Sequence, residues 1–363
     1  MKIVFFTNNY HTNQNNIVSS LLANKFRVQY LVVNIVNKKV PFNLKLNALD
    51  KHTNYFGQIY HYLKDEKPDV IIIRGRRLVA MKVYLISKFL NIPSLRSEQV
   101  ILETEETFIN KHIPSILLTL IKKVQFLFLS KTLITPIVKD YLKYQRYESK
   151  NKFFLPLPID VKSQKSKKYN LSKQLKLLTV GKFQDRKKHF LLLHVVNILS
   201  QKYTIKLKII GSCSGEAAKK YDKEMLNFIK KNSLENIVTI EKNKEHSQVL
   251  KEYKNHDLFI LPSVDEEFGY STVEAMAVGL PVIVSNDAGC QYLTNNNSNG
   301  FIFKKNDIAD LKDKITYFLE NKDQLKIKGA SGRQFIQRYY STEFYIKQLK
   351  RILKNEFNIA IDK

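Results

Sequence analysis

Short runs of β-branched residues alternate with segments of helical periodicity along most of the 363-residue chain. This alternation predicts parallel strands joined by crossover helices, which is an α/β architecture. The chain also exceeds the length at which one hydrophobic core keeps growing, so we expect two domains. The clearest predicted strands are Lys2–Phe6, Tyr30–Val33, Val70–Ile73, Leu133–Thr135, Leu175–Val180, Ile205–Ile210, Leu258–Leu261 and Val282–Val284.

The domain boundary is predicted between Lys152 and Lys176. Within it the segment Leu155–Pro158, Leu-Pro-Leu-Pro, cannot continue a helix, and residues 162–170 are polar and basic. Nine of the 11 glycines follow this stretch, which favours close backbone approach to a ligand in the second half. We therefore expect an amino-terminal domain at 1–165, a second domain at 166–340, and a final helix at 341–363 that packs back toward the first.

The net charge of the chain is +27, from 60 basic and 33 acidic residues. Such an excess indicates an anionic partner, which can be a nucleic acid, a phospholipid surface or a phosphorylated substrate. The basic residues are scattered rather than gathered with aromatic residues, so no nucleic-acid module is visible and none is expected as a partner.

Several features bear on the compartment. The cysteines Cys213 and Cys290 form no metal-type pair, which fits a reducing cytoplasm. Residues Met1–Phe6 indicate a buried strand rather than a signal peptide, so we expect the mature protein to start near Met1. The apolar stretch Ile113–Ile137 is interrupted by lysines, so it contains no uninterrupted apolar run long enough to span a bilayer. It suits either a core helix or an amphipathic surface that rests on lipid.

The most informative segment runs from Leu261 to Pro281 and predicts a strand, a loop, a two-turn helix and a second strand. Ser271 is a candidate N-cap, so the following amides would offer partial positive charge to a diphosphate. Gly269 would let a phosphate approach the main chain, and Glu266 and Glu274 offer carboxylates for sugar hydroxyls. Two structural alternatives remain: Ser271 and Glu274 form a capping box, and Glu266 belongs to a solvated acidic loop.

This segment resembles the E-x7-E signature of the retaining glycosyltransferases of family 4. The neighbours of the two glutamates match in register at Pro262-Ser263, Phe268-Gly269, Glu274–Ala277 and Gly279-x-Pro281. The resemblance implies the GT-B fold, in which two Rossmann-like domains face each other across a cleft. It also implies that Glu266 contacts the transferred sugar, that Glu274 contacts the ribose, and that the anomeric configuration is retained.

A second block, residues 181–188 with the sequence Gly-Lys-Phe-Gln-Asp-Arg-Lys-Lys, is similar to the family's Gly-Arg-Leu-x-x-x-Lys-Gly loop. In the family the two cations of this loop grip the donor diphosphate. Lys182 stands in the place of the arginine, Lys187 matches the lysine, and Lys188 replaces the final glycine. The alternative is one more basic surface loop in a strongly basic chain.

The resemblance implies a donor site with Glu266 and Lys187 as catalytic residues. No cofactor is expected beyond the co-substrate, a UDP-sugar or GDP-sugar. The chain contains no Asp-x-Asp triplet, so we predict that the site holds no metal and that the activity is metal-independent. The expected donor-binding residues are Gly181, Lys182, Lys187, Glu266, Phe268, Gly269, Tyr270, Ser271 and Glu274.

The acceptor side cannot be inferred from the family, because its glycine-rich first loop and its amino-terminal histidine are missing here. Four residues are acceptor-side candidates by strand-end position, because open α/β sheets bind ligands at the carboxyl ends of their strands. Surface or structural roles are the alternative for each of them. These candidates are His11, Arg74, Arg76 and Glu98.

Together these features predict a cytoplasmic enzyme that transfers a sugar to a glycan or lipid-linked acceptor in bacterial surface polysaccharide assembly. The charge adds a hypothesis of peripheral contact with the anionic inner face of the cytoplasmic membrane. Two alternatives are another enzyme on the same fold, such as a nucleotide-sugar epimerase or a phosphorylase, and a basic nucleic-acid-binding protein.

Overall fold

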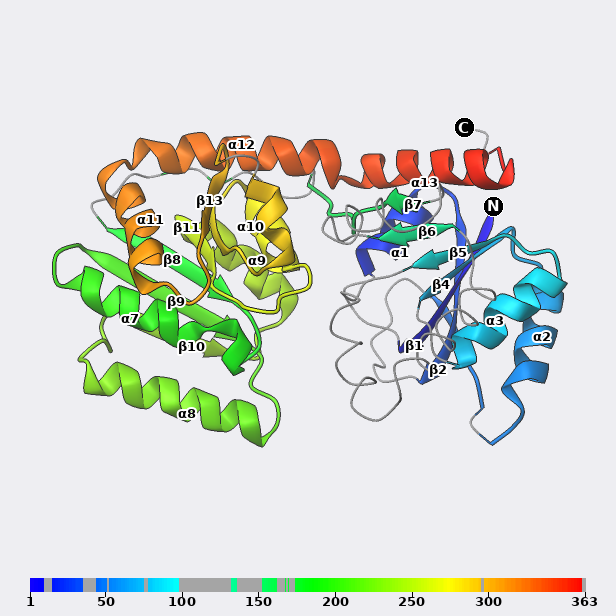
Figure 1. Ribbon diagram of the computed structural model, residues 1–363, viewed down its shortest axis with the longest axis horizontal. Helices are drawn as coiled ribbons and strands as arrows, with labels where there is room; N and C mark the ends of the chain where they lie inside the picture. Colours follow the sequence, from blue (N-terminus) through cyan, green and yellow to red (C-terminus); the bar gives the residue numbers. More distant parts are fainter. Residues whose placement is uncertain are drawn as a thin grey trace, which may run out of the picture. The chain divides into compact units, whose positions relative to one another are not determined.

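A computed structural model of the chain divides into two compact units (Figure 1). The first unit combines Met1–Pro158 with Thr342–Lys363, and the second is Ile159–Ser341. The structure describes residues 1–9, 15–34, 44–50, 52–74, 78–97, 132–135, 152–161, 167, 169, 174–294 and 297–360. Most of the apolar stretch 113–137 therefore lies outside the described residues.

The first unit is built on a 7-stranded sheet of order β3-β2-β1-β4-β5-β6-β7, in which every neighbouring pair is parallel (Figure 1). The strands are β1 (Lys2–Asn9), β2 (Arg27–Asn34), β3 (Lys45–Ala48), β4 (Val70–Arg74), β5 (Ser94–Ser97), β6 (Leu133–Thr135) and β7 (Lys152–Phe154). The described helices of this unit are α1 (Asn15–Ala23), α2 (Tyr55–Glu66), α3 (Leu78–Phe89) and α13 (Thr342–Phe357).

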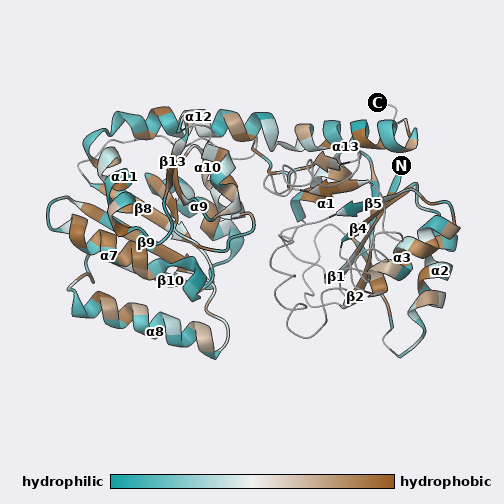
Figure 2. Cartoon of the chain, in the orientation of Figure 1, coloured by the Kyte–Doolittle hydropathy of each residue, from teal (hydrophilic) through white to brown (hydrophobic). Residues whose placement is uncertain are grey.

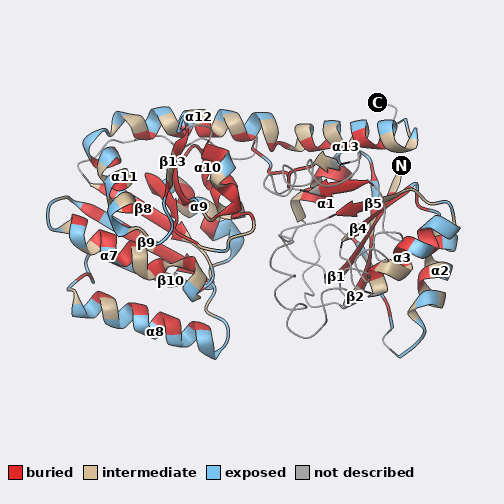
Figure 3. Cartoon of the chain, viewed as in Figure 1, coloured by how far each residue is buried: buried red, intermediate tan, exposed pale blue. Residues whose placement is uncertain are grey.

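The core of this unit explains why β4 is a nearly continuous apolar run. Residues Val70 to Ile73 of β4 are at most 2% exposed, because helices pack on the sheet. Ile71 and Ile73 pack with Ile59 and Leu63 of α2 and with Val83 of α3 in one cluster. The central strands are correspondingly hydrophobic (Figure 2) and buried (Figure 3).

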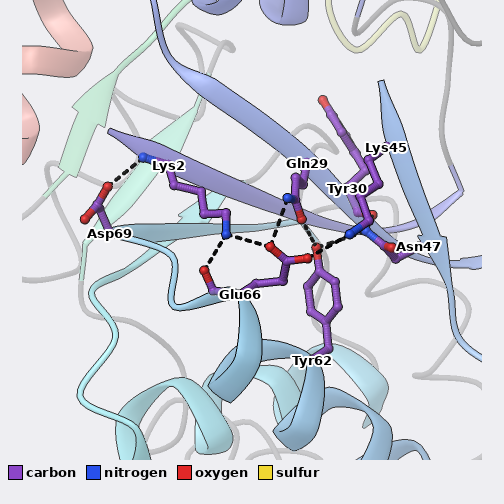
Figure 4. Close-up of polar contacts among 8 residues, drawn as sticks. All are labelled: Lys2, Gln29, Tyr30, Lys45, Asn47, Tyr62, Glu66 and Asp69. Carbon is purple, nitrogen blue, oxygen red and sulfur yellow. Dashed lines mark hydrogen bonds and ion pairs between the residues drawn. The ribbon is translucent and has the colours of Figure 1, made fainter. Parts of the chain in front are cut away.

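A polar cluster lies at the amino end of the strands β1 and β2 (Figure 4). The Glu66 carboxylate, at the end of α2, accepts from Lys2 Nζ at 2.6 Å, from Lys45 Nζ at 2.9 Å and from Gln29 at 3.0 Å. The two lysines hold the pKa of Glu66 down at about 2. Burial raises the pKa of Tyr62, whose hydroxyl donates to Gln29 at 2.7 Å. The cluster fastens α2 to the sheet edge opposite the carboxyl ends of the strands.

The helix α13 completes the core of the first unit, although the second unit separates it from the rest in sequence. Its Thr342 hydroxyl lies 3.1 Å from that of Ser20 in α1, and its Glu356 accepts from Thr132 at 3.1 Å. Its inward residues are buried: Tyr345, Ile346, Leu349, Ile352 and Leu353.

The second unit carries a 6-stranded parallel sheet of order β10-β9-β8-β11-β12-β13 (Figure 1). The strands are β8 (Leu175–Val180), β9 (Ile205–Gly211), β10 (Val238–Lys242), β11 (Leu258–Leu261), β12 (Val282–Ser285) and β13 (Gly300–Phe303). The helices are α7 (His189–Ser200), α8 (Glu216–Lys231), α9 (His246–Asn255), α10 (Tyr270–Val278), α11 (Ile308–Glu320) and α12 (Asp323–Tyr339), with two 3-10 turns, η2 (Asp185–Lys187) and η3 (Gly289–Thr294).

All the strands predicted from the sequence are present, within a few residues of their predicted ends. The prediction omitted β3, β5, β7, β10 and β13, most of which lie at or near a sheet edge and are short or carry polar residues. Among the described helices none combines the length and the apolar character needed to cross a membrane.

Candidate donor site

The strand order of the second unit reverses between β8 and β11. From β8 the chain adds β9 and β10 on one side, and it then returns to add β11, β12 and β13 on the other. Ligands of open α/β sheets bind in the crevice at the carboxyl ends of the strands where the order reverses. The loops that leave β8 and β11 at this point are residues 181–188 and 262–269, the two blocks that the sequence indicated.

The loop after β8 is organised around the buried side chain of Lys187, which is about one-tenth exposed. A Cβ at Gly181 would lie 3.2 Å from Cδ of Lys187, so the glycine makes room for the lysine's alkyl chain. Lys188 has φ of 49° at the start of α7, in the left-handed region that favours glycine. This conformation explains why the family has glycine at that position. Here Lys188 adopts the same conformation, and its Nζ lies 2.7 Å from Asp185 Oδ2.

The loop after β11 delivers Glu266 to the same place. Its Oε2 accepts from Nζ of Lys187 and, at 3.0 Å, from Nη1 of Arg186. Its backbone carbonyl accepts from the amide of Gly289 at 2.8 Å. A Cβ at Gly289 would lie 1.9 Å from the carbonyl oxygen of Glu267, so only glycine permits this close approach. Glu266 is therefore a fixed, largely buried carboxylate, and the alternative of a solvated acidic loop is wrong for this residue.

The start of α10 differs from its predicted form. The N-cap is Gly269, at φ of 78°, and Ser271 lies inside the first turn, so the prediction of Ser271 as N-cap is wrong. A Cβ on Gly269 would meet Leu261 Cδ2 at 2.7 Å and Cys290 Sγ at 2.9 Å. The glycine is thus required by backbone conformation and packing. Gly279 ends the helix at φ of 94° with its amide on Ala275 and Met276 carbonyls, as the sequence indicated.

The Glu274 carboxylate contacts residues of α9 rather than the start of its own helix. Its Oε1 lies 2.6 Å from Nε2 of His246, and its Oε2 accepts from the Tyr253 hydroxyl at 2.9 Å. These are tertiary contacts with α9, so the capping-box alternative is wrong. The hydrogen bond to Glu274 raises the pKa of His246, while burial raises that of Tyr253. Glu274 is buried, and its carboxylate retains acceptor sites beyond the two that these contacts use.

The other predicted donor-site residues have different environments. Lys182 is exposed. Phe268 is only 9% exposed, because its ring packs against those of Tyr270 and Tyr340 at centroid distances of 6.2 and 6.3 Å. Phe268 therefore supports the loop, whereas Lys182 presents its charge to solvent.

Three residues that contact the two glutamates were absent from the sequence prediction: Arg186, His246 and Tyr253. Arg186 stood inside the quoted block, and its adjacency to Lys187 was the available signal. His246 is the first residue of α9 and Tyr253 lies further along it, after β10, a strand that the sequence pattern does not predict. No local pattern links them to Glu274.

The first unit has a pocket at the carboxyl ends of its own central strands. Arg74, the last residue of β4, lines it, together with Thr7 of β1 and Ser97 of β5. The remaining lining is mostly apolar: Phe5, Phe6, Ile17, Tyr30, Ile72, Ile134, Leu155, Leu157 and Tyr345. The other acceptor-side candidates, His11, Arg76 and Glu98, lie outside the described residues.

Two doubly wound parallel sheets, each with polar groups at its strand-order reversal, define the chain as a protein of the GT-B fold class. Solved structures share this fold over nearly the full length of the chain. HepE from Anabaena, solved with UDP, matches with a TM-score of 0.81 at 15% identity, over 98% of this chain and 100% of that one. A glycosyltransferase from Rickettsia africae matches with a TM-score of 0.78 at 17% identity, over 98% and 99%.

Residues 161–335, nearly all of the second unit, match the family model described as Glycosyl transferases group 1. The capsular polysaccharide biosynthesis glycosyltransferase CapM of Staphylococcus aureus is 29% identical over 46% of this chain and 42% of its own length. An N-acetylgalactosaminyltransferase of Campylobacter jejuni that acts on N,N'-diacetylbacillosaminyl-diphospho-undecaprenol is 31% identical over 30% of each chain. The match thus spans less than half of these relatives.

Proposed function

We propose that this chain is a retaining glycosyltransferase that moves a sugar from a nucleoside-diphosphate sugar to a glycan or lipid-linked acceptor in bacterial surface polysaccharide assembly. The observation that carries the proposal is the meeting of Glu266 and Lys187 where the strand order reverses in the second unit. The family of residues 161–335 and the printed activities of the relatives support it.

The reaction breaks the bond between the anomeric carbon and a phosphate oxygen, so negative charge develops on the leaving diphosphate. Fixed positive groups lower the barrier by stabilising that charge. Two lysines of the loop after β8 supply them. Lys187 is buried and fixed by its ion pair, and Lys182 is exposed near the start of the loop. We assign no protein nucleophile. Glu266 orients the transferred sugar, and Glu274 binds the ribose hydroxyls.

We propose UDP as the nucleotide of the donor, because HepE of Anabaena, which shares the fold, was solved with UDP and with UDP-glucose. GDP is the alternative. At 15% identity HepE shares only the fold, so the calorimetry described below decides between UDP and GDP.

The pocket of the first unit is our candidate acceptor site. Arg74 in its lining suits a phosphate, because a guanidinium binds phosphate oxygens through paired hydrogen bonds. The apolar lining suits less polar parts of the same molecule. A lipid-linked acceptor would bring the protein to the inner face of the cytoplasmic membrane, and the net charge of +27 would favour anionic lipid there. Sedimentation with anionic but not neutral liposomes at low salt tests this contact, and no binding to either would contradict it.

The donor assignment is tested by calorimetry with UDP, GDP, ADP and their glucose conjugates. The preferred ligand should bind at least tenfold more weakly to Glu274→Ala and to Lys187→Ala. Lys219→Ala, which removes an exposed lysine on α8, is the matched control and should bind normally. Unchanged affinity in both site variants would refute the assignment. Release of free nucleoside diphosphate only when an acceptor is present separates transfer from epimerisation.

A further inference from the structure

The family resemblance assigns no role to Arg186, yet the structure places this side chain at Glu266. Its Nη1 lies 3.0 Å from Oε2 of Glu266 and 3.4 Å from the carbonyl oxygen of Asp265. The same Oε2 accepts from Nζ of Lys187. Two cations from consecutive residues of η2 therefore converge on a single carboxylate oxygen.

The guanidinium of Arg186 is held in this orientation from its other edge. The side-chain amide of Gln184 is assigned in the orientation that lets both its oxygen and its nitrogen form hydrogen bonds. In this orientation its oxygen accepts from Nε and Nη2 of Arg186 at 2.8 and 3.0 Å. The backbone is fixed as well, because the Arg186 carbonyl accepts from the amide of Val264 at 2.8 Å. The side chain remains about two-fifths exposed, so a ligand in solvent can reach it. A charged group that is both preorganised and reachable suits anion binding.

The charges of this cluster do not balance. Arg186 and Lys187 contribute two positive charges where Glu266 contributes one negative charge, and the Glu266 side chain is only 12% exposed. When the Glu266 carboxylate leaves the cluster, both positive charges become available, and together they favour an anion with more than one charge. A diphosphate meets this requirement, and a guanidinium matches its oxygens with paired donors, which an ammonium cannot do.

We infer that Arg186 and Lys187 together form a diphosphate clamp, and that Glu266 occupies this clamp as an internal anion while no donor is bound. This inference rests on the proposed function. Donor binding then exchanges one anion for another: the diphosphate takes the two cations, and the released carboxylate turns to the sugar hydroxyls. Arg186 supplies the guanidinium that the loop lacks at Lys182. Free nucleotide must displace the Glu266 carboxylate from the two cations and gains nothing in return. A nucleotide sugar also displaces it, but its sugar hydroxyls then bind the released carboxylate.

The inference predicts opposite effects for two variants. Arg186→Ala removes half of the clamp, so both free nucleoside diphosphate and nucleotide sugar should bind about tenfold more weakly or worse, and Arg186→Lys should recover part of the loss. Glu266→Gln removes the internal competitor, so free nucleoside diphosphate should bind severalfold more tightly. The same variant should lose the sugar contact, so the preference for nucleotide sugar over free nucleotide should fall.

The experiment is calorimetry of the full chain with UDP, GDP and ADP and with their glucose conjugates, at two salt concentrations. Arg338→Ala is the matched control, since Arg338 is an exposed arginine of α12 in the same unit. Thermal unfolding of each variant establishes that it is folded. If the wild type binds nucleotide and Arg186→Ala binds it with the same affinity as the control Arg338→Ala, the clamp is overturned. Weaker binding of free nucleotide to Glu266→Gln overturns the internal competitor. A wild-type chain that binds none of the six ligands refutes the proposed function itself.

Discussion

Nε2 of His246 lies 2.6 Å from Oε1 of Glu274, and the pair joins the start of α9 to the buried face of α10. The raised pKa of His246 means that the folded state holds its proton more tightly than the unfolded state. The stabilisation from this pair is therefore complete below the ordinary pKa of 6.5 and is lost as the pH rises through the higher folded value. The imidazole is about two-thirds exposed, so the effect on global stability is small.

The first prediction concerns this titration. In Glu274→Gln the His246 pKa should fall toward its ordinary value, because the neutral amide does not stabilise the protonated imidazole as the negative carboxylate does. Two-dimensional NMR of the imidazole signals, assigned with His246→Asn, measures the change. An identical His246 pKa in wild type and Glu274→Gln would show that the contact has no electrostatic part.

A second prediction follows from the buried His189. Burial, with Lys187 nearby, lowers the pKa of His189 to about 3. The unfolded chain binds this proton below pH 6.5 and the folded chain does not, so stability should fall as the pH drops from 6.5 toward 3. The slope from one such group is about 1.4 kcal/mol per pH unit.

His189→Phe should remove this slope, because a phenyl ring fits the edge-to-face contacts with Phe183 and Tyr221 and has no proton to gain. Among the described residues Nδ1 of His189 has no hydrogen-bond partner, so the substitution breaks no hydrogen bond of that atom. Urea unfolding at pH 7 and pH 5 measures the difference. Equal acid sensitivity of the variant and the wild type would assign the slope to other groups.

A third prediction compares two glycines. Gly289→Ala places a methyl group 1.9 Å from the Glu267 carbonyl oxygen, so it should destabilise the second unit and displace Glu266. Gly57→Ala in α2 meets nothing within 4 Å, so it should stabilise the protein by roughly 0.5–1 kcal/mol through the helix preference of alanine. Thermal unfolding and nucleotide binding should separate the two, with nucleotide binding lost only in Gly289→Ala.

A fourth prediction is metal independence, which follows from the missing Asp-x-Asp triplet and from the cations of η2. Transfer measured in excess chelator should equal transfer in untreated buffer. Loss of activity that magnesium or manganese restores would contradict this prediction.

Much of the fold could be predicted because parallel strands buried on both faces are continuous apolar runs. Val70–Arg74 and Leu258–Leu261 are examples that any window of hydropathy identifies. β5, with the sequence Ser-Leu-Arg-Ser, has no such run, and its pairing with β4 depends on tertiary contacts. β10 was missed for a similar reason, since it lies at a sheet edge and its sequence, Val-Thr-Ile-Glu-Lys, has only two apolar residues.

The site was predictable to a different extent for each residue. The register of neighbouring residues indicated Glu266 and Lys187 together, and the structure brings them into contact. For Ser271 the local rule failed, because Gly269 adopts a left-handed conformation that starts the helix earlier. The partners of Glu274 come from α9, which is distant in sequence, so no spacing rule could have identified them.

The inclusion of α13 in the first unit has a consequence for biosynthesis. The ribosome completes β1 to β7 early, yet Ile346, Leu349 and Leu353, which fill that unit's core, are translated only after the entire second unit. The second unit, continuous from Ile159 to Ser341, can fold as it emerges, whereas the first must wait with an exposed apolar surface. We therefore expect chaperone binding to the nascent first unit to last until α13 has been translated.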